Sequence, residues 1–263
     1  KGVLEDIQKQ LENAETKEEK DFLSAACEGL LSAKKISGKF ADTAEEMLKS
    51  DPQNENLKRI AESARRSPWE KPQSFYEALN VYAFMRKVIG SLEGVGPNSF
   101  GRIDMDLYPF YEADIKSGAI TREEAYELIS KFLIIFDCHY DHNKEMVGYA
   151  DHELECTYVL GGCDADGKPI YNELTKMFLD ATYEEKIIFP KIKCRFSKNS
   201  PKEYLDELDK PVTNGTSTIL YENDDAAIPA LIRSGISPDD AWDYLASGCW
   251  DIETNCAGCQ NCG

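Results

Sequence analysis

Long apolar runs, a leader segment and an excess of positive charge are all missing from this sequence. No apolar run reaches the roughly 18 residues that a membrane-spanning helix needs, and the first residues do not form the apolar core of a signal peptide. The chain carries 30 Lys and Arg against 48 Asp and Glu, a net charge of -18. Nucleic acids and anionic membranes both require clustered positive charge. We therefore expect a soluble, cytoplasmic protein that binds neither nucleic acid nor a membrane.

Histidine is also scarce, with only His139, His142 and His152 in the chain. They lie among aspartates in a polar stretch, where a metal site is conceivable. Two zinc ligands on one helix face are typically four positions apart, whereas His139 and His142 are three apart in a stretch typical of a loop. We predict solvated or hydrogen-bonded histidines in preference to metal ligands.

The sequence lacks the character of a disulfide-bonded secreted domain, although it contains nine cysteines. Disulfide frameworks belong to short extracellular chains with an even number of cysteines. An odd number, scattered along a chain of 263 residues, indicates free thiols in a reducing compartment. So many oxidation-sensitive side chains also fit an anaerobic organism.

The first part of the chain, residues 1–155, is predicted to be mainly helical. Two capping boxes, in which a Thr hydroxyl and a Glu carboxylate bind free amides at a helix start, begin at Thr16 and Thr121. Gly38 is expected to interrupt a helix. The stretch 90–102, rich in glycine, is predicted to be a loop.

From residue 156 the apolar pattern changes to strands that alternate with helices. Strands are predicted at 156–160, 191–196 and 216–221, and helices at 172–185, after Ser200, at 228–232 and at 237–245. The crossovers are long enough for parallel pairing. Residues 156–263 therefore predict βαβ units and an α/β fold, in which ligands bind beyond the carboxyl ends of the strands.

The last predicted helix leads into a short loop that carries Cys249, followed by the carboxylates of Asp251 and Glu253. Cysteine is among the most buried residue types, so an inert thiol is one interpretation of Cys249. A reactive thiol beside a carboxylate that moves a proton is the other.

Several sequence blocks, in the same order as in the family, resemble the glycyl radical enzymes, whose members include pyruvate formate-lyase and the glycerol and choline lyases. The resemblance spans nearly the whole chain. The blocks are Pro72-Gln73-Ser74-Phe75-Tyr76-Glu77-Ala78-Leu79, Gly101-Arg102-Ile103-Asp104 with Tyr108-Pro109-Phe110-Tyr111, Val159-Leu160-Gly161-Gly162 through Asn172-Glu173-Leu174-Thr175, Ile228-Pro229-Ala230-Leu231, and Asp240-Ala241-Trp242-Asp243-Tyr244-Leu245-Ala246-Ser247-Gly248-Cys249.

This resemblance implies a helical N-terminal part followed by a half-barrel of parallel strands, part of a ten-stranded α/β barrel. It implies that Cys249 is the active-site cysteine, which forms a thiyl radical and abstracts hydrogen from a small-molecule substrate. A separate radical S-adenosylmethionine activating enzyme installs a glycyl radical in that family, and the full-length protein is expected to be a homodimer. The resemblance also places Ser99 near a substrate-contacting position, and we expect Arg102 and Asp104 to form an internal ion pair.

The sequence departs from the family in two places. Family lyases commonly have Gly-Cys-x-Glu-Pro, whereas Asp251 stands at the Glu position here and Glu253 is a competing candidate. A single cysteine in the loop favours an eliminase-like or decarboxylase-like lyase over a pyruvate-cleaving enzyme. No Arg-Val-x-Gly motif is present before Gly263. We expect residues 1–263 to be the N-terminal and central part of the family domain, which binds no cofactor itself, depends on a glycyl radical in the missing C-terminal part, and is inactive alone.

Three other functions stay open from the residues. Cys256, Cys259 and Cys262 have the spacing of ligands for zinc or an iron–sulfur cluster, although free thiols in a loop have the same spacing. A formate acyltransferase-type activity is a second alternative. The third is a non-catalytic interaction protein that has kept the half-barrel.

Overall fold

A computed structural model describes residues 2–93, 99–138, 157–216, 218–247 and 251–254. The chain divides into two compact units, Lys1–Leu92 and Glu93–Gly263. Among the described residues, no helix combines the length and the apolar composition that a membrane span needs.

The first unit is helical, as predicted. The capping box at Thr16 is confirmed: the Glu19 amide donates to Thr16 Oγ1 at 3.1 Å, and the Thr16 amide donates to Glu19 at 2.9 Å. Gly38 does not interrupt the helix that follows, because one glycine costs only about 1 kcal/mol in a long helix. The helices are α1 (Gly2–Asn13), α2 (Lys17–Leu48), α3 (Glu55–Arg66) and α4 (Phe75–Glu93).

A buried serine joins α2 to the end of α3. The single hydroxyl proton of Ser37 is shared between the carbonyl oxygens of Ala64, at 2.6 Å, and Ser67, at 2.8 Å. This shared donor serves carbonyl groups at a helix end, which have no partner within the helix itself.

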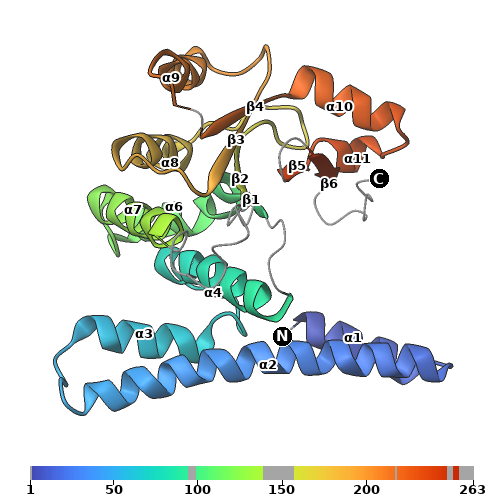
Figure 1. Ribbon diagram of the computed structural model, residues 1–263, viewed down its shortest axis with the longest axis vertical. Helices are drawn as coiled ribbons and strands as arrows, with labels where there is room; N and C mark the ends of the chain where they lie inside the picture. Colours follow the sequence, from blue (N-terminus) through green and yellow to red (C-terminus); the bar gives the residue numbers. More distant parts are fainter. Residues whose placement is uncertain (1, 94–98, 139–156, 217, 248–250, 255–263) are drawn as a thin grey trace, which may run out of the picture. The chain divides into compact units, whose positions relative to one another are not determined.

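The second unit is built on a four-stranded parallel sheet in the order β1-β2-β3-β4 (Figure 1). The α/β class with parallel strands is therefore confirmed. The strand β3 has the predicted bounds. The elements are β1 (Ser99–Arg102), α5 (Ile103–Asp106), α6 (Tyr108–Ser117), α7 (Arg122–Cys138), β2 (Thr157–Gly161), α8 (Glu173–Glu184), β3 (Lys191–Phe196), α9 (Lys202–Thr213), β4 (Ile219–Asn223), α10 (Asp224–Arg233), α11 (Pro238–Ala241), β5 (Tyr244–Ser247) and β6 (Asp251–Thr254).

The predicted loop over 90–102 is wrong at both ends, because residues 90–93 belong to α4 and the last four residues form β1, which pairs with β2. The pairing register shifts between Ser99 and Arg102. Gly101, with φ +72°, has the left-handed backbone that such an irregularity requires. Glycine indicates a loop in local sequence, but here it allows a bulged strand.

Helices cover one side of the sheet, and a hairpin lies on the other (Figure 1). Phe100 of β1 packs on Phe132 and Phe136 of α7, with ring centroids 5.3 and 5.0 Å apart. The Tyr158 hydroxyl of β2 is 2.9 Å from that of Thr182 in α8. Because side chains alternate along a strand, the residues on either side of Phe100 in β1 and of Tyr158 in β2 face the hairpin.

The predicted helix over 237–245 is wrong beyond Ala241. Ser237 caps the helix as expected, with its hydroxyl accepting from the Asp240 amide at 3.2 Å. The helix α11 then ends, and Tyr244 begins the antiparallel hairpin of β5 and β6. Ile252 of β6 packs against a small core around Tyr244, Ala241 and α10.

Candidate active site

Buried charges gather at the carboxyl end of the parallel sheet. Arg102 ends β1, Arg195 is the penultimate residue of β3, and Asp224 directly follows β4. The side chains of both arginines are fully buried, and that of Asp224 is nearly so. Since the carboxyl ends of parallel strands meet at one edge, strands far apart in sequence bring these groups together.

Arg195 fixes the backbone that enters the hairpin. Its Nε and Nη2 donate to the two carboxylate oxygens of Asp224, at 2.9 and 3.2 Å. Its Nη1 donates to the Tyr244 carbonyl at 2.9 Å, and Nη2 to the Trp242 carbonyl at 2.8 Å. The Tyr244 hydroxyl in turn donates to Asp224 at 2.7 Å. Every nitrogen of the guanidinium therefore donates inside the protein.

Arg102 also binds the segment that enters the hairpin, through the side chain of Asp243. Its Nη1 pairs with Asp243 at 3.0 Å, and its Nη2 donates to the carbonyl oxygens of Gly161 and Cys163 at 3.2 and 2.6 Å. The predicted ion pair between Arg102 and Asp104 is therefore wrong, because Arg102 pairs with a residue 141 positions away. Residues 242–244 are thus held by two buried arginines.

Asp104 instead links the sheet to α8. Its Oδ2 accepts from the Gly161 amide at 2.8 Å and from the Thr175 hydroxyl at 2.7 Å. Burial raises the pKa of Asp104 to about 6, although these two bonds and the charge of Arg102 oppose the shift. Asp104 therefore has a structural role in this arrangement.

The hairpin crosses the sheet from this charged edge toward β1 and β2. The Thr157 hydroxyl, at the start of β2, donates to the Ala246 carbonyl at 3.2 Å. Ser247 is opposite Asp251 in the hairpin register, so residues 248–250 form the connection. Cys249, the predicted active-site cysteine, is the middle residue of this connection and lies outside the described residues.

The other predicted site residues lie on or beside the hairpin. Asp251 begins β6, and its side chain is outside the described part of the chain. Glu253 is half-buried and opposite Leu245. Ser99 is half-buried; its hydroxyl accepts from the Gly101 amide at 3.1 Å and lies 3.5 Å from the carbonyl of Thr157. Ser99 is therefore next to the residue that binds Ala246 of the hairpin.

The other thiols near this site are unsuited to act as nucleophiles. Burial raises the pKa of Cys163, and the Asp224 carboxylate raises it further. Burial also raises the pKa of Cys194 far above its ordinary value. Both side chains therefore stay protonated and unreactive at neutral pH.

The candidate metal ligands Cys256, Cys259 and Cys262 lie outside the described residues. The three histidines, predicted to be solvated or hydrogen-bonded, also lie outside them. Within the described ranges, no group of three His, Cys, Asp or Glu side chains is placed to hold a metal ion.

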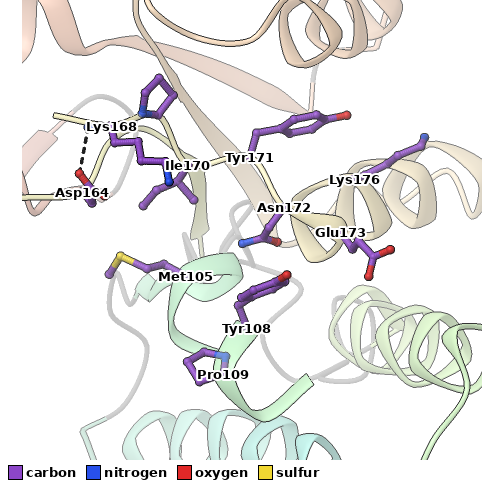
Figure 2. Close-up of a pocket in the computed structure, with 11 residues that line it drawn as sticks. Met105, Tyr108, Pro109, Asp164, Lys168, Ile170, Tyr171, Asn172, Glu173 and Lys176 are labelled. Atoms are coloured by element: carbon purple, nitrogen blue, oxygen red, sulfur yellow. Dashed lines mark hydrogen bonds between the residues drawn. The ribbon is translucent and has the colours of Figure 1, made fainter. Parts of the chain in front are cut away.

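A groove of about 680 Å³ lies near this edge, outside the charge network (Figure 2). Tyr108 and Pro109 of α6 form one wall, and the segment between β2 and α8 forms another, with the Lys168 amide donating to Asp164 at 2.9 Å. Its charges are balanced, with Lys168 and Lys176 against Asp164 and Glu173. None of the described residues that line it belongs to the hairpin.

Sequence reasoning missed the residues that hold the hairpin: Arg195, Asp224, Asp243 and Tyr244. One signal was available. In β3, Lys193 and Arg195 occupy a strand that is otherwise suited to a buried sheet. A charge inside such a strand indicates a buried partner.

Comparison with known proteins supports the predicted family. The description "pyruvate formate lyase-like" matches residues 1–261. The chain is 28% identical to (2S)-3-sulfopropanediol dehydratase of Klebsiella oxytoca over 96% of its own length and 32% of that enzyme.

Two solved structures have the same fold. A glycyl radical enzyme from Archaeoglobus fulgidus is 26% identical, with a TM-score of 0.81 over 95% of this chain and 34% of that one. The glycerol-bound B12-independent glycerol dehydratase from Clostridium butyricum is also 26% identical, with a TM-score of 0.84 over 96% of this chain and 33% of that one. The chain thus spans about a third of the length of these relatives. It belongs to the pyruvate formate lyase-like family.

Proposed function

We propose that this chain is the part of a glycyl radical lyase that presents the reactive cysteine, Cys249, to a small organic substrate. The observation that carries the proposal is the hairpin, whose entry is fixed by Arg102 and Arg195 and whose connection contains Cys249. Radical transfer over a thiol demands a fixed position, because a misplacement of 1 Å can cost about a hundredfold in rate.

The described surroundings fit such a thiol. Tyr244 and Ala246, in the strand before Cys249, are fully buried. Burial of this kind excludes water and oxygen from a reactive intermediate. A glycyl radical, expected in the part of the relatives that this chain does not span, would supply the species that oxidises the Cys249 thiol.

The roles of the neighbouring residues follow from their places. Asp251 is two residues beyond Cys249 and is proposed to move a proton during elimination, with Glu253 as the competing carboxylate. Ser99 is proposed to contact substrate, because its neighbour Thr157 binds the hairpin. The reaction class is cleavage of a C–O, C–N or C–C bond. A radical S-adenosylmethionine activating enzyme, a homodimeric full-length protein and a cytoplasmic location complete the proposal.

The test uses the complete protein that contains this chain, activated anaerobically by its activating enzyme. We expect a glycyl radical signal by electron paramagnetic resonance, and consumption of a substrate from a panel that includes glycerol and (2S)-3-sulfopropanediol, the compounds named for two relatives. Cys249→Ser should keep the radical signal and lose all turnover. Cys27→Ser, at a half-buried thiol of α2, is the matched control and should keep both. Turnover by Cys249→Ser would refute the proposal.

A further inference from the structure

Two charged side chains lie on the hairpin side of the sheet, in addition to those at its carboxyl edge. Lys193 is two residues before Arg195 in β3, so both face the same side. Glu222 of β4 is the register partner of Arg195 and shares that side. Arg195 binds the backbone of residues 242 and 244, which identifies this side as the one that carries the hairpin.

Both charges are buried. Lys193 is fully buried, and Glu222 is 7% exposed. Lysine and glutamate are almost never buried in this way without a compensating charge. Burial raises the pKa of Glu222, and the charges of Lys193 and Arg195 oppose this shift. The two cations therefore favour an ionised carboxylate at a position from which water is largely removed.

One oxygen of this carboxylate has no hydrogen-bond partner among the described residues. Glu222 Oε1 is inaccessible to solvent, and no described residue forms a hydrogen bond with it. A second orphan, Thr254 Oγ1, belongs to β6 of the hairpin. The residues that carry these two atoms both lie near Tyr244. Thr254 is opposite Tyr244 in the hairpin, and the charge of Glu222 raises the pKa of the Tyr244 hydroxyl. Buried polar atoms without partners are rare in folded proteins and destabilise them.

A structural role for the pair does not account for the orphaned oxygen. The opposite charges of Lys193 and Glu222 attract each other on this side of the sheet. Replacing buried charges of this kind by apolar side chains of similar volume is often neutral or stabilising, so folding of the sheet does not by itself explain them. A ligand that donates a hydrogen bond to Glu222 Oε1 would remove the penalty. The hairpin side is also where the proposed thiyl chemistry takes place.

We propose that Glu222, supported by Lys193, is a substrate-binding residue that accepts a hydrogen bond from a hydroxyl group of the substrate. This inference rests on the proposed function, because it takes the hairpin side as the substrate side. The preferred substrate therefore carries a hydroxyl group, and Glu222 sets this preference.

Binding is measured by calorimetry on the complete, unactivated protein, with glycerol, (2S)-3-sulfopropanediol and propane-1-sulfonate as probes. We expect at least one of the two hydroxyl-bearing probes to bind, and Glu222→Gln to weaken that binding at least tenfold. A charge-assisted hydrogen bond is about twice as strong as a neutral one, which gives the loss its direction. Glu203→Gln, an exposed residue of α9, is the matched control and should bind as the unaltered protein does.

A second variant guards against misfolding of the first. Lys193→Met with Glu222→Leu removes both charges at similar volume, and should fold at least as stably while losing the binding. Binding unaffected by Glu222→Gln or by the double variant would overturn the proposal, as would the failure of both hydroxyl-bearing probes to bind. If neither variant folded, the pair would be structural and the proposal would also fall. Because no radical is needed, a failure of activation would count against the proposed function alone.

Discussion

Replacing Arg195 with methionine should release the entry of the hairpin. The change leaves the buried Asp224 carboxylate without its cation, and the carbonyl groups of Trp242 and Tyr244 without their donor. Removing one partner of a buried ion pair costs about 3–5 kcal/mol. We expect the closed state of the hairpin to lose about 4 kcal/mol, since the lost carbonyl bonds add to the cost and local relaxation reduces it.

Amide hydrogen exchange of peptides covering β5 and β6 measures this opening directly. At about 1.4 kcal/mol for each factor of ten, exchange should accelerate by about a thousandfold. Arg65→Met is the matched control, because Arg65 also binds two carboxylates, Asp42 and Glu45, but on the exposed surface of the first unit. It should leave exchange in β5 and β6 unchanged.

The double variant Arg195→Met with Asp224→Asn separates charge from geometry. It removes the uncompensated charge and keeps an acceptor for the Tyr244 hydroxyl, so hairpin exchange should be no faster than in Arg195→Met alone. If exchange in Arg195→Met stayed within threefold of the unaltered protein, or if Arg65→Met accelerated it equally, the assignment of Arg195 as the hairpin's anchor would be refuted.

Three further changes test the scaffold by urea unfolding. The pKa of Asp104 is raised from 3.8 to about 6, so its protonated form stabilises the fold below about pH 4, and this contribution is lost as the pH rises through 6. Asp104→Asn should therefore gain stability relative to the unaltered protein between about pH 4 and 6, by at most about 3 kcal/mol. A difference in unfolding free energy that does not change with pH would contradict this. Gly161→Ala should lower the free energy of unfolding by about 3 kcal/mol or more, because φ is +73° and the new Cβ would lie 2.6 Å from a backbone carbonyl oxygen. Gly118→Ala, with the same φ but open space around the new Cβ, should lower it by only about 1 kcal/mol. Equal losses in the two variants would exclude the clash. Ser37→Ala should cost about 1–2 kcal/mol, since two carbonyl groups lose the buried hydroxyl proton that they share. Ser32→Ala removes a solvent-exposed hydrogen bond in the same helix and should be nearly neutral. A neutral Ser37→Ala would show that the shared bond contributes nothing.

Local signals predicted much of the fold. The capping residues Thr16 and Thr121 act within four residues of themselves, and both boxes are present. The strand at Lys191–Phe196 was predicted from its alternation. These features depend on neighbours in sequence, so no knowledge of the rest of the chain is required.

The wrong predictions depend on distant partners. The helix predicted over 237–245 stops at Ala241 because the residues that follow are bound by distant parts of the chain: Arg195 binds the Trp242 and Tyr244 carbonyls from 47 and 49 positions away, and Tyr244 pairs with Thr254 in the hairpin. Arg102 was assigned to Asp104, its neighbour in sequence, and pairs with Asp243 instead. In the same way, β1 gains its pairing only from β2, which lies 58 positions further along the chain at Thr157.

For the site, the family resemblance predicted the cysteine, and the structure supplied the arginines that anchor its hairpin. Cys249 stays a prediction. The chain around it gave no local reason to connect it with β1 or β3, because those contacts arise only when the sheet has formed.

Arg195 binds the entry of the hairpin through the backbone carbonyl oxygens of residues 242 and 244, and every amino acid has a backbone carbonyl. These two bonds do not depend on side chains of the segment, although the side chains of Asp243 and Tyr244 form bonds of their own with Arg102 and Asp224. Residues further along the hairpin could be exchanged, during evolution or in a redesigned enzyme, without disturbing how the segment is mounted. The place where the hairpin begins is therefore fixed separately from the sequence that the hairpin carries.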